Sequence, residues 1–189
     1  MAGTEFQWIA VVIGMLTGLG VTRLLTSVVA TLRSRAVAAI DWLPMLWAAS
    51  IFLAQLDYWW VVHDLKSLVP QWTYPQFLKL LVSPLLLFFA AALILPLGEL
   101  KPGESHHEIF NSHGHWALMA LGAYQLQTIW EEVDYWQVSL LSRTNLVLLA
   151  FAVAPILAFF GSRRYNWVIA GTFLAGSVYF IFVNVNTLD

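Results

Sequence analysis

The sequence contains no cysteine and few charged residues. Without cysteine the chain can form no disulfide, no thiolate metal site and no cysteine nucleophile. Only 11% of its 189 residues are charged, whereas a soluble domain carries about 25%, so the chain has too little charge to cover a soluble surface. A net charge of −2, without a basic patch, gives no sign of a nucleic-acid partner. Phosphate-binding glycine loops, zinc-protease motifs and serine-hydrolase elbows are missing too, so the sequence does not support an enzyme.

Long apolar segments dominate what is present. Hydrophobic residues make up 60% of the chain, and the mean hydropathy is +0.73. A membrane-spanning helix needs roughly 20 mainly apolar residues, and six segments qualify: 6–32, 42–62, 77–97, 116–136, 145–160 and 167–185. The connections between them are short. We therefore predict an all-α integral membrane protein, a single domain over residues 1–189 built as a compact bundle of about six transmembrane helices.

The distribution of basic residues predicts the orientation of this bundle. Six spans place both termini on the same side of the membrane. More basic residues flank the opposite side than the terminal side: Arg33, Arg35, Lys101, Arg163 and Arg164 against Lys66, Lys79 and Arg143. Because cytoplasmic loops are enriched in lysine and arginine, we expect both termini to lie outside the cytoplasm.

Two acidic clusters lie near the ends of predicted spans. Asp57 lies in the second span, and Glu131, Glu132 and Asp134 lie in the fourth. Both spans run from the cytoplasmic to the outer face, so both clusters are expected at the outer end of the bundle. Ionisable groups in hydrocarbon are unfavourable, and they usually pair, face a polar interior or mark an ion pathway. An acidic outer end would attract cations.

Helical spacing relates these acids to each other. Residues three, four and seven apart share a face of a helix, which puts Glu131 and Asp134 on one stripe and Asp57 on a stripe of the second span. If the two stripes face each other, the carboxylates crowd, and at least one should be protonated or bind a cation. We therefore predict an ion- or proton-binding site formed by Asp57, Glu131, Glu132 and Asp134. The alternative is that Glu132 and Asp134 are solvated at the interface and Asp57 is hydrogen-bonded to a neighbouring side chain.

Arg23 is the only basic residue well inside the first span, and we include it in the predicted site. A buried guanidinium requires a carboxylate or several carbonyls. Asp57 is the candidate carboxylate, which would make Arg23 an internal counter-ion. If each span is centred in the membrane, however, Arg23 and Asp57 lie at depths that differ by on the order of 10 Å. The alternative is that Arg23 extends to the cytoplasmic interface.

Small residues recur at every fourth position of the first span, beginning with Gly14, Gly18 and Thr22. Small residues at this spacing let the backbones of two membrane helices approach closely. The face they form predicts either a seam between two copies of the chain, and so a homo-oligomer, or tight packing inside one protomer.

Four histidines gather in the segment 99–115, namely His106, His107, His113 and His115. Neutral imidazoles suit Zn²⁺ or another transition metal, and this weak metal site is the one cofactor that the sequence suggests. The spacing matches no motif with a fixed scaffold, however, and the intervening glycines and asparagine indicate a flexible loop.

Three motifs in the first hundred residues carry a resemblance. They are Gly18-Leu-Gly-Val-Thr-Arg-Leu-Leu-Thr26, Asp41-Trp-Leu-Pro-Met-Leu-Trp47 and Gln55-x-x-x-Trp59-Trp60. Together they resemble small, multi-span bacterial membrane proteins of unassigned function. The resemblance implies the bacterial inner membrane, with both termini then periplasmic, and it transfers no activity and no site residue.

The favoured functional hypothesis is the translocation of a cation or proton through an acidic, outer-facing cavity between the second and fourth spans. A rival hypothesis is a non-transporting membrane subunit or sensor that docks a protein or lipid partner. A third is a membrane enzyme assisted by a metal at the histidine-rich segment.

Overall fold

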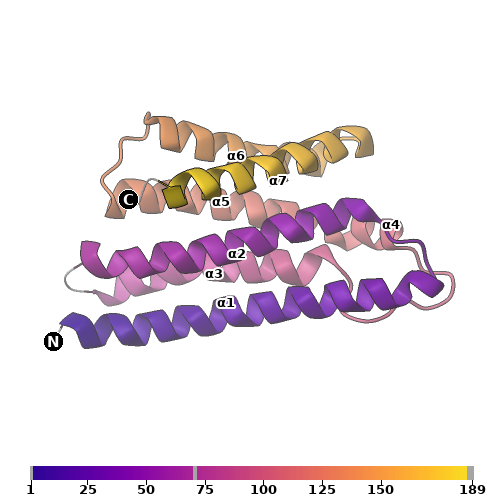
Figure 1. Ribbon diagram of the computed structural model, residues 1–189, viewed down its shortest axis with the longest axis horizontal. Helices are drawn as coiled ribbons and strands as arrows, with labels where there is room; N and C mark the ends of the chain where they lie inside the picture. Colours follow the sequence, from indigo (N-terminus) through magenta and orange to yellow (C-terminus); the bar gives the residue numbers. More distant parts are fainter. Residues whose placement is uncertain (1, 70–71, 187–189) are drawn as a thin grey trace.

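The computed structural model describes residues 2–69 and 72–186, apart from the side chains of 2–5, 64, 66–68 and 183–186, and its regular structure there is entirely helical (Figure 1). Six long helices follow the predicted segments closely: α1 (Ala2–Arg33), α2 (Trp42–Leu68), α3 (Tyr74–Ile94), α5 (Trp116–Tyr135), α6 (Arg143–Phe160) and α7 (Arg163–Asn186). Three short elements complete the fold: η1 (Ser34–Ala36), α4 (His106–Ile109) and η2 (Phe110–Gly114). The predicted all-α fold is confirmed.

Five of the six long helices are long and apolar enough to cross a membrane: α1, α2, α3, α6 and α7. α5 does not belong to this group, since glutamines and acids in its second half make it less apolar. The predicted count of six spans is therefore not confirmed. Five such helices are consistent with a membrane protein, and so are the large apolar side chains on their outer faces, such as Leu157 and Phe182.

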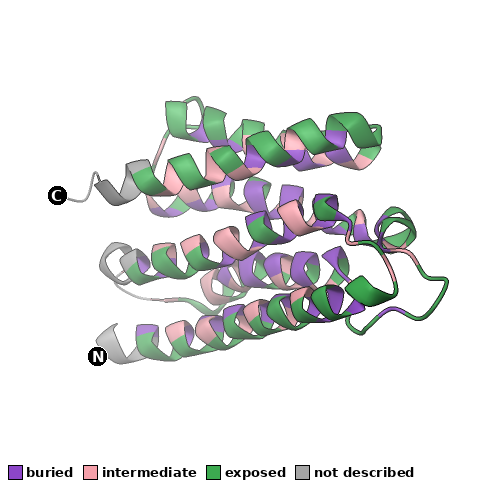
Figure 2. Ribbon diagram, turned by 45° about the vertical axis from the view of Figure 1, so that its right-hand side comes forward, coloured by how far each residue is buried: buried purple, intermediate pink, exposed green. Residues whose placement is uncertain are grey.

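The long helices run antiparallel to their neighbours in the sequence, so both termini lie at the same end of the bundle (Figure 1). One group of three helices contains α1, α2 and α3, and a second group contains α5, α6 and α7. α3 packs on α5, and α2 packs on α7, whereas α2 and α5 contact each other sparsely. Buried residues line the inner faces of both groups, and exposed residues cover the outside (Figure 2). The sparse contact between α2 and α5 leaves room for a cavity.

Short polar signals set the starts of three long helices. The Asp41 carboxylate accepts a hydrogen bond from the Leu43 amide at 3.1 Å and caps α2. Thr73 and Gln76 form a capping box at the start of α3. The Ser142 hydroxyl accepts a hydrogen bond from the Asn145 amide at 3.1 Å at the start of α6. Each of these satisfies an amide that the first turn of a helix leaves without a partner.

Two prolines leave backbone carbonyls of α3 without a helical partner, because proline has no N–H. Pro84 cannot donate to the Leu80 carbonyl, which instead accepts a hydrogen bond from the Tyr58 hydroxyl at 2.8 Å. Pro96 cannot donate to the Ala92 carbonyl, which instead accepts from Arg23 Nη2 at 2.7 Å. Side chains of α2 and α1 thus replace the missing backbone donors, as membrane helices require.

The small-residue face of α1 is not the one that packs inside the protomer. Gly18 and Thr22 are exposed, and Gly14 is half-buried. α1 packs closely against α2 at Gly20 instead, where a β-carbon would lie 2.7 Å from the Gln55 side-chain nitrogen. The expectation of packing inside the protomer is therefore wrong for Gly18 and Thr22, and a homo-oligomer through this face stays a prediction.

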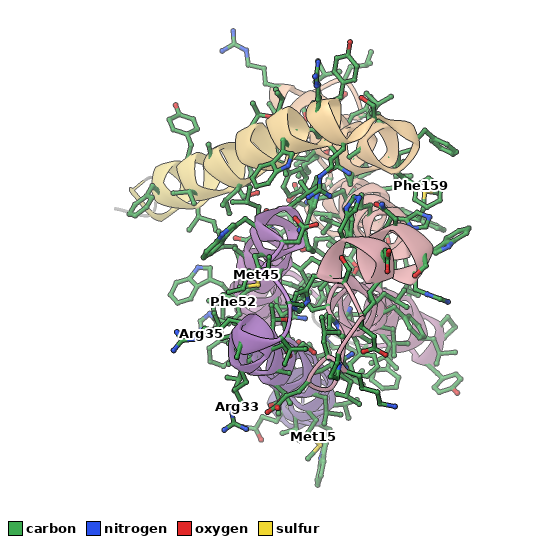
Figure 3. The ribbon with its side chains drawn as sticks, turned by 90° about the vertical axis from the view of Figure 1, so that its right-hand side faces the viewer. Met15, Arg33, Arg35, Met45, Phe52 and Phe159 are labelled. Carbon is green, nitrogen blue, oxygen red and sulfur yellow. The ribbon has the colours of Figure 1, made fainter. Side chains whose placement is uncertain are left out.

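The histidine-rich segment is more ordered than the sequence predicts. Helical turns occupy residues 106–114, in place of the expected flexible loop, and His106 is buried. A turn remains at residues 101–104, where the Glu104 amide donates to the Lys101 carbonyl at 3.0 Å and Gly103 has a φ of 93°. This segment lies at the end of the bundle opposite the termini, where Arg33 and Arg35 point away from the helices (Figure 3).

Candidate functional site

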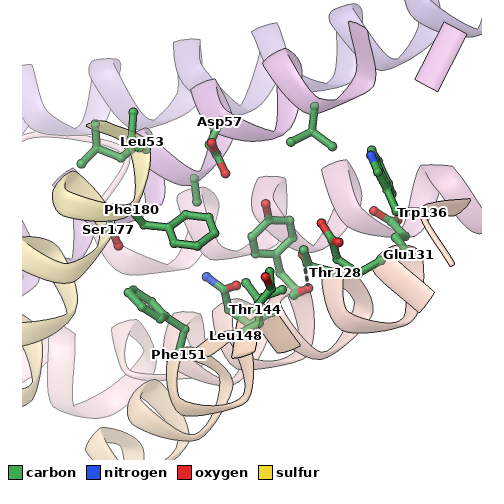
Figure 4. A pocket seen from close by; sticks show the side chains of 16 residues that line it. Leu53, Asp57, Thr128, Glu131, Trp136, Thr144, Leu148, Phe151, Ser177 and Phe180 are labelled. Atoms are coloured by element: carbon green, nitrogen blue, oxygen red, sulfur yellow. Dashed lines mark hydrogen bonds between the residues drawn. The ribbon is translucent and has the colours of Figure 1, made fainter. Parts of the chain in front are cut away.

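A cavity of about 280 Å³ lies between α2, α5, α6 and α7, at the end of the bundle that holds both termini. Three of the predicted acids line it: Asp57 from α2, and Glu131 and Glu132 from α5 (Figure 4). Thr144 at the start of α6 and Ser177 of α7 line its other sides. The structure therefore brings together the acids of the second and fourth predicted spans.

Asp57 is the open carboxylate of this cavity. Its side chain is half-buried and accepts no hydrogen bond from any residue that the structure describes. Ala54 and Val61 flank it on the same face of α2, as helical spacing predicts. The alternative expectation, a hydrogen bond from a neighbouring side chain, is therefore wrong. A carboxylate without a donor, facing a cavity, is available to a proton or a cation.

Glu131 is held in place, in contrast to Asp57. Its side chain is only 3% exposed. Ser83 of α3 donates a hydrogen bond to Glu131 Oε1 at 2.7 Å, and Gln127 Nε2 donates to the same oxygen at 3.4 Å. Glu132, one position further along α5, is half-buried at the wall of the cavity. The site therefore combines one fixed carboxylate with two that have more freedom.

Asp134 lies outside the cavity and pairs with a lysine. Lys79 Nζ of α3 lies 2.5 Å from Asp134 Oδ2 and 4.3 Å from the centre of the Trp130 ring. Asp134 is exposed, and such surface pairs contribute little stability. At the position of Asp134, the helical face that carries Glu131 and Asp134 therefore points towards α3 and not towards α2. Asp134 matches the alternative reading of an interfacial residue.

Arg23 does not meet Asp57. Its guanidinium donates to Ser27 Oγ, to the Ala92 carbonyl at 2.7 Å and to the Leu95 carbonyl at 3.4 Å. Among the described residues no ion pair joins Arg23 to a carboxylate, and Arg23 does not line the cavity. The expected pairing with Asp57 is wrong, because the carboxyl end of α3 offers carbonyls and partial negative charge at the depth of Arg23. The Arg23 guanidinium is instead satisfied by backbone carbonyls, the other kind of partner that the sequence analysis allowed.

Aromatic side chains close the inner side of the cavity. Phe151 lines the cavity and packs against Phe173, with ring centres 5.0 Å apart. Phe173 packs in turn against Trp47 at 5.3 Å, and Trp47 Nε1 donates to Asn166 Oδ1 at 2.8 Å. Asn166 lines a second cavity, of about 400 Å³, at the opposite end of the bundle. The aromatic barrier, defined as Phe151, Phe173 and Trp47, thus separates the two cavities.

An ion pair that the sequence analysis did not identify ties α2 to α7 near the second cavity. Arg163 Nη2 lies 2.8 Å from Asp41 Oδ1, and the Asp41 side chain is only 5% exposed. Arg163 Nη1 also contacts His107 Nδ1 at 2.6 Å. Asp41 and Arg163 lie 122 positions apart, so no spacing in the sequence links them.

The four histidines of the 99–115 segment do not converge. His107 contacts Arg163 and Asn111, and His113 contacts Ser112. His115 packs against the Phe159 ring with centres 4.8 Å apart, and His106 is buried. Among the side chains that the structure describes, no group of three or more histidines or acids is placed to hold a metal ion. Nothing in the arrangement supports the suggested zinc site.

Burial of His106 predicts a dependence of stability on pH. The side chain is 3% exposed, and neither ring nitrogen has a partner among the described residues. Burial lowers the pKa of His106, and Asp41 opposes this in part. The unfolded chain then binds the proton more readily, so the free energy of unfolding should fall as the pH drops below about 6.5. Replacing His106 with leucine removes both the titration and the unpaired nitrogens, and should flatten this dependence without lowering stability at neutral pH.

Thermal unfolding in detergent between about pH 5 and pH 8 tests this expectation. The exposed His113 provides the control, because His113→Leu should keep the wild-type pH dependence. An His106→Leu variant whose midpoint falls with acidification as steeply as the wild type would contradict the assignment.

Sequence reasoning missed several polar residues at the wall of the cavity. Gln125 and Thr128 of α5 line it beside the acids, as does Tyr124. A signal for them was present, since Gln125, Thr128 and Glu132 follow the spacing of one helical face. That face, and not the one through Gln127 and Asp134, is turned towards α2.

No family model, no curated protein and no solved structure that was compared with this chain matches it.

Proposed function

We propose that this protein binds a proton or a cation in the cavity between α2 and α5 and carries it across a membrane. The observation that carries the proposal is the convergence of Asp57, Glu131 and Glu132 on one cavity of about 280 Å³. Ionisable groups inside a bundle of apolar helices usually mark such a pathway. Among the described residues that line the cavity there is no lysine or arginine to neutralise the three acids.

In this proposal α5 is a sixth membrane span. α5 has 20 residues, close to the number needed to cross the hydrocarbon, and it packs on two helices, α3 and α6, that are apolar enough to span. Its acids face a cavity or pair with Lys79, so they need not face lipid. Six spans put both termini on one side, which the basic residues at the other end favour as the outer side. In the bacterial inner membrane the cavity would then open towards the periplasm.

The two main acids are proposed to act in different ways. Asp57, which has no hydrogen-bond donor, would accept the proton or contact the cation first. Glu131, held by Ser83 and Gln127, would provide a fixed second position. Further movement requires the aromatic barrier to open, because Phe151 stands at the inner wall and Phe173 and Trp47 are buried behind it. The described conformation would correspond to the state open to the outer side.

Flux measurements in proteoliposomes test the proposal. Proton flux is followed with an internal pH-sensitive dye, and Na⁺ or K⁺ flux with a matching indicator. The double variant Asp57→Asn, Glu131→Gln should lose at least about tenfold of the flux, because a group that cannot ionise neither carries a proton nor attracts a cation. Asp134→Asn is the matched control, since Asp134 lies outside the cavity, and its flux should stay within about twofold of the wild type.

Unchanged flux in the double variant would refute the assigned site. The absence of any flux from the wild type would refute translocation and leave the rival hypothesis of a non-transporting subunit or sensor. Loss of flux in both the double variant and the Asp134→Asn control would point to general damage to the fold, and thermal unfolding of each variant separates that outcome from the others.

A further inference from the structure

We infer that the ligand of this cavity is a small organic ammonium, an amine or quaternary ammonium that carries an aromatic or alkyl group, and not a bare metal cation. The inference rests on the proposed cation site at Asp57 and narrows its substrate class. It follows from the spacing of the acids, the apolar walls of the cavity, an unpaired amide and the absence of basic side chains among the described lining residues.

The arrangement of the acids does not suit a metal ion. A hard cation such as Ca²⁺ or Mg²⁺ needs about six or more oxygen ligands at roughly 2.0 to 2.6 Å. Asp57, Glu131 and Glu132 all line the cavity, yet in the described part of the chain no three acidic or histidine side chains come close enough to hold a metal. One oxygen of Glu131 is already occupied by Ser83 and Gln127. The carboxylates surround a space and do not converge on a point.

The volume and the walls of the cavity suit an organic cation. About 280 Å³ is close to the lower end of the range for small-molecule pockets, and it is far more than a bare ion fills. Tyr124, Phe151, Phe180 and Trp136 contribute aromatic rings to the walls. In Figure 4 Phe180 lies between Asp57 on one side of the cavity and Phe151 on the other, and Trp136 lies beside Glu131. Aromatic faces attract ammonium groups, most strongly where water is excluded.

Gln125 provides an independent indication of a ligand. Its side chain is only 8% exposed and lines the cavity, and no described residue forms a hydrogen bond with its amide. Buried polar groups in proteins are almost always paired, so an unpaired amide at a cavity wall indicates a partner inside the cavity. The amide oxygen is an acceptor for an ammonium N–H, in addition to the Asp57 carboxylate.

The charge of the walls distinguishes a free ammonium from a lipid headgroup that contains one. Ethanolamine and choline headgroups carry a phosphate next to the ammonium. The lining residues that the structure describes include no lysine, arginine or histidine to receive that phosphate, and three acids would repel it. The structure therefore favours an ammonium without an attached anion.

Equilibrium binding of benzyltrimethylammonium tests the inference, measured by titration calorimetry on the full chain in a neutral maltoside detergent. Neopentylbenzene, its uncharged isostere, provides the ligand control. Benzyltrimethylammonium should bind saturably with one site per chain. We expect at least about tenfold weaker binding for neopentylbenzene, and a similar loss for Asp57→Asn. Gln125→Leu should also weaken binding, because it removes the partial negative charge of the amide oxygen, which attracts the N-methyl groups of a quaternary ammonium, while keeping the size of the side chain. Asp134→Asn should change the affinity less than about twofold.

The outcomes separate this inference from the proposed function. If benzyltrimethylammonium does not bind, or binds no better than neopentylbenzene, the inference is wrong, and proton or metal-ion flux that depends on Asp57 would leave the proposed function intact. Competition by added phosphatidylethanolamine would also overturn the inference, since it would assign the cavity to a lipid headgroup. Asp57-dependent binding without competition from the lipid supports a free organic ammonium.

Discussion

Replacing Arg23 with methionine is expected to lower the free energy of unfolding by about 1–3 kcal/mol. Methionine fills similar space but donates no hydrogen bond. The Ala92 carbonyl would then lose its donor, and Pro96 has no N–H with which to replace it. The Leu95 carbonyl would lose the same donor. In a protein surrounded by lipid, water cannot easily satisfy these groups, so the loss should fall in the upper part of this range.

Unfolding of the variant by SDS in mixed micelles measures this loss. Arg33→Met is the matched control, because the Arg33 side chain is 70% exposed and reaches Glu99 only at 3.8 Å, so its stability should change by less than about 0.5 kcal/mol. Affinity for a cavity ligand provides a second measurement. If Arg23 stabilises α3 and is not a counter-ion of Asp57, Arg23→Met should leave that affinity within about twofold of the wild type. Equal losses of stability in Arg23→Met and Arg33→Met would contradict the assigned role.

Replacing Gly122 with valine is expected to destabilise the contact between α5 and α6 by about 1–3 kcal/mol. A β-carbon at Gly122 would lie 2.8 Å from Ile156 Cγ1 and 3.1 Å from the Ala152 carbonyl oxygen. The isoleucine can change its rotamer, but the carbonyl belongs to the backbone of α6, so the two helices would have to separate. Because α5 and α6 both line the cavity, the same change should also weaken ligand binding.

Gly18→Val provides the control for this prediction, because a β-carbon at Gly18 on the exposed face of α1 would meet no atom within 4 Å. The stability of the protomer should change by less than about 0.5 kcal/mol in this variant. If the face containing Gly14, Gly18 and Thr22 joins two copies of the chain, Gly18→Val should instead shift the oligomeric state on size exclusion. A Gly122→Val protein as stable as Gly18→Val would show that α5 and α6 are not packed this closely.

The sequence predicted the helices well because a hydrocarbon layer imposes a simple length requirement. Each apolar segment of about the required length became a helix, and the ends were further marked by capping residues such as Asp41 and Thr73. The shared position of Asp57 and Glu131 also followed from the sequence, since alternating directions and helical rise place both residues towards one end of the bundle. The position of a residue along the helix axis can thus be predicted from the sequence.

Rotation about a helix axis was harder to predict. Two faces of α5 carry polar residues, and only packing against α3 shows that Asp134 turns to Lys79 while Gln125 and Thr128 turn to the cavity. The partner of Arg23 was hidden for a related reason. It is a carbonyl 69 positions away, freed by a proline, and a backbone acceptor has no signature in side-chain patterns. The sequence favoured a carboxylate as the partner of Arg23, because charged side chains can be identified in a sequence whereas a backbone carbonyl without a helical donor cannot.

The most direct test of the account is the reactivity of a single cysteine placed in the cavity. The chain has no cysteine of its own, so Ser177→Cys introduces one thiol at the cavity wall without further changes. Val178→Cys, at the exposed neighbouring position on α7, is the control. Both are treated in membranes with membrane-impermeant thiol reagents, one cationic and one anionic. We expect Ser177→Cys to react much faster than Val178→Cys and to prefer the cationic reagent by about tenfold or more. Asp57→Asn should reduce this preference. Equal reactivity of the two positions, or no preference for the cationic reagent, would contradict an accessible acidic cavity between α2 and α5.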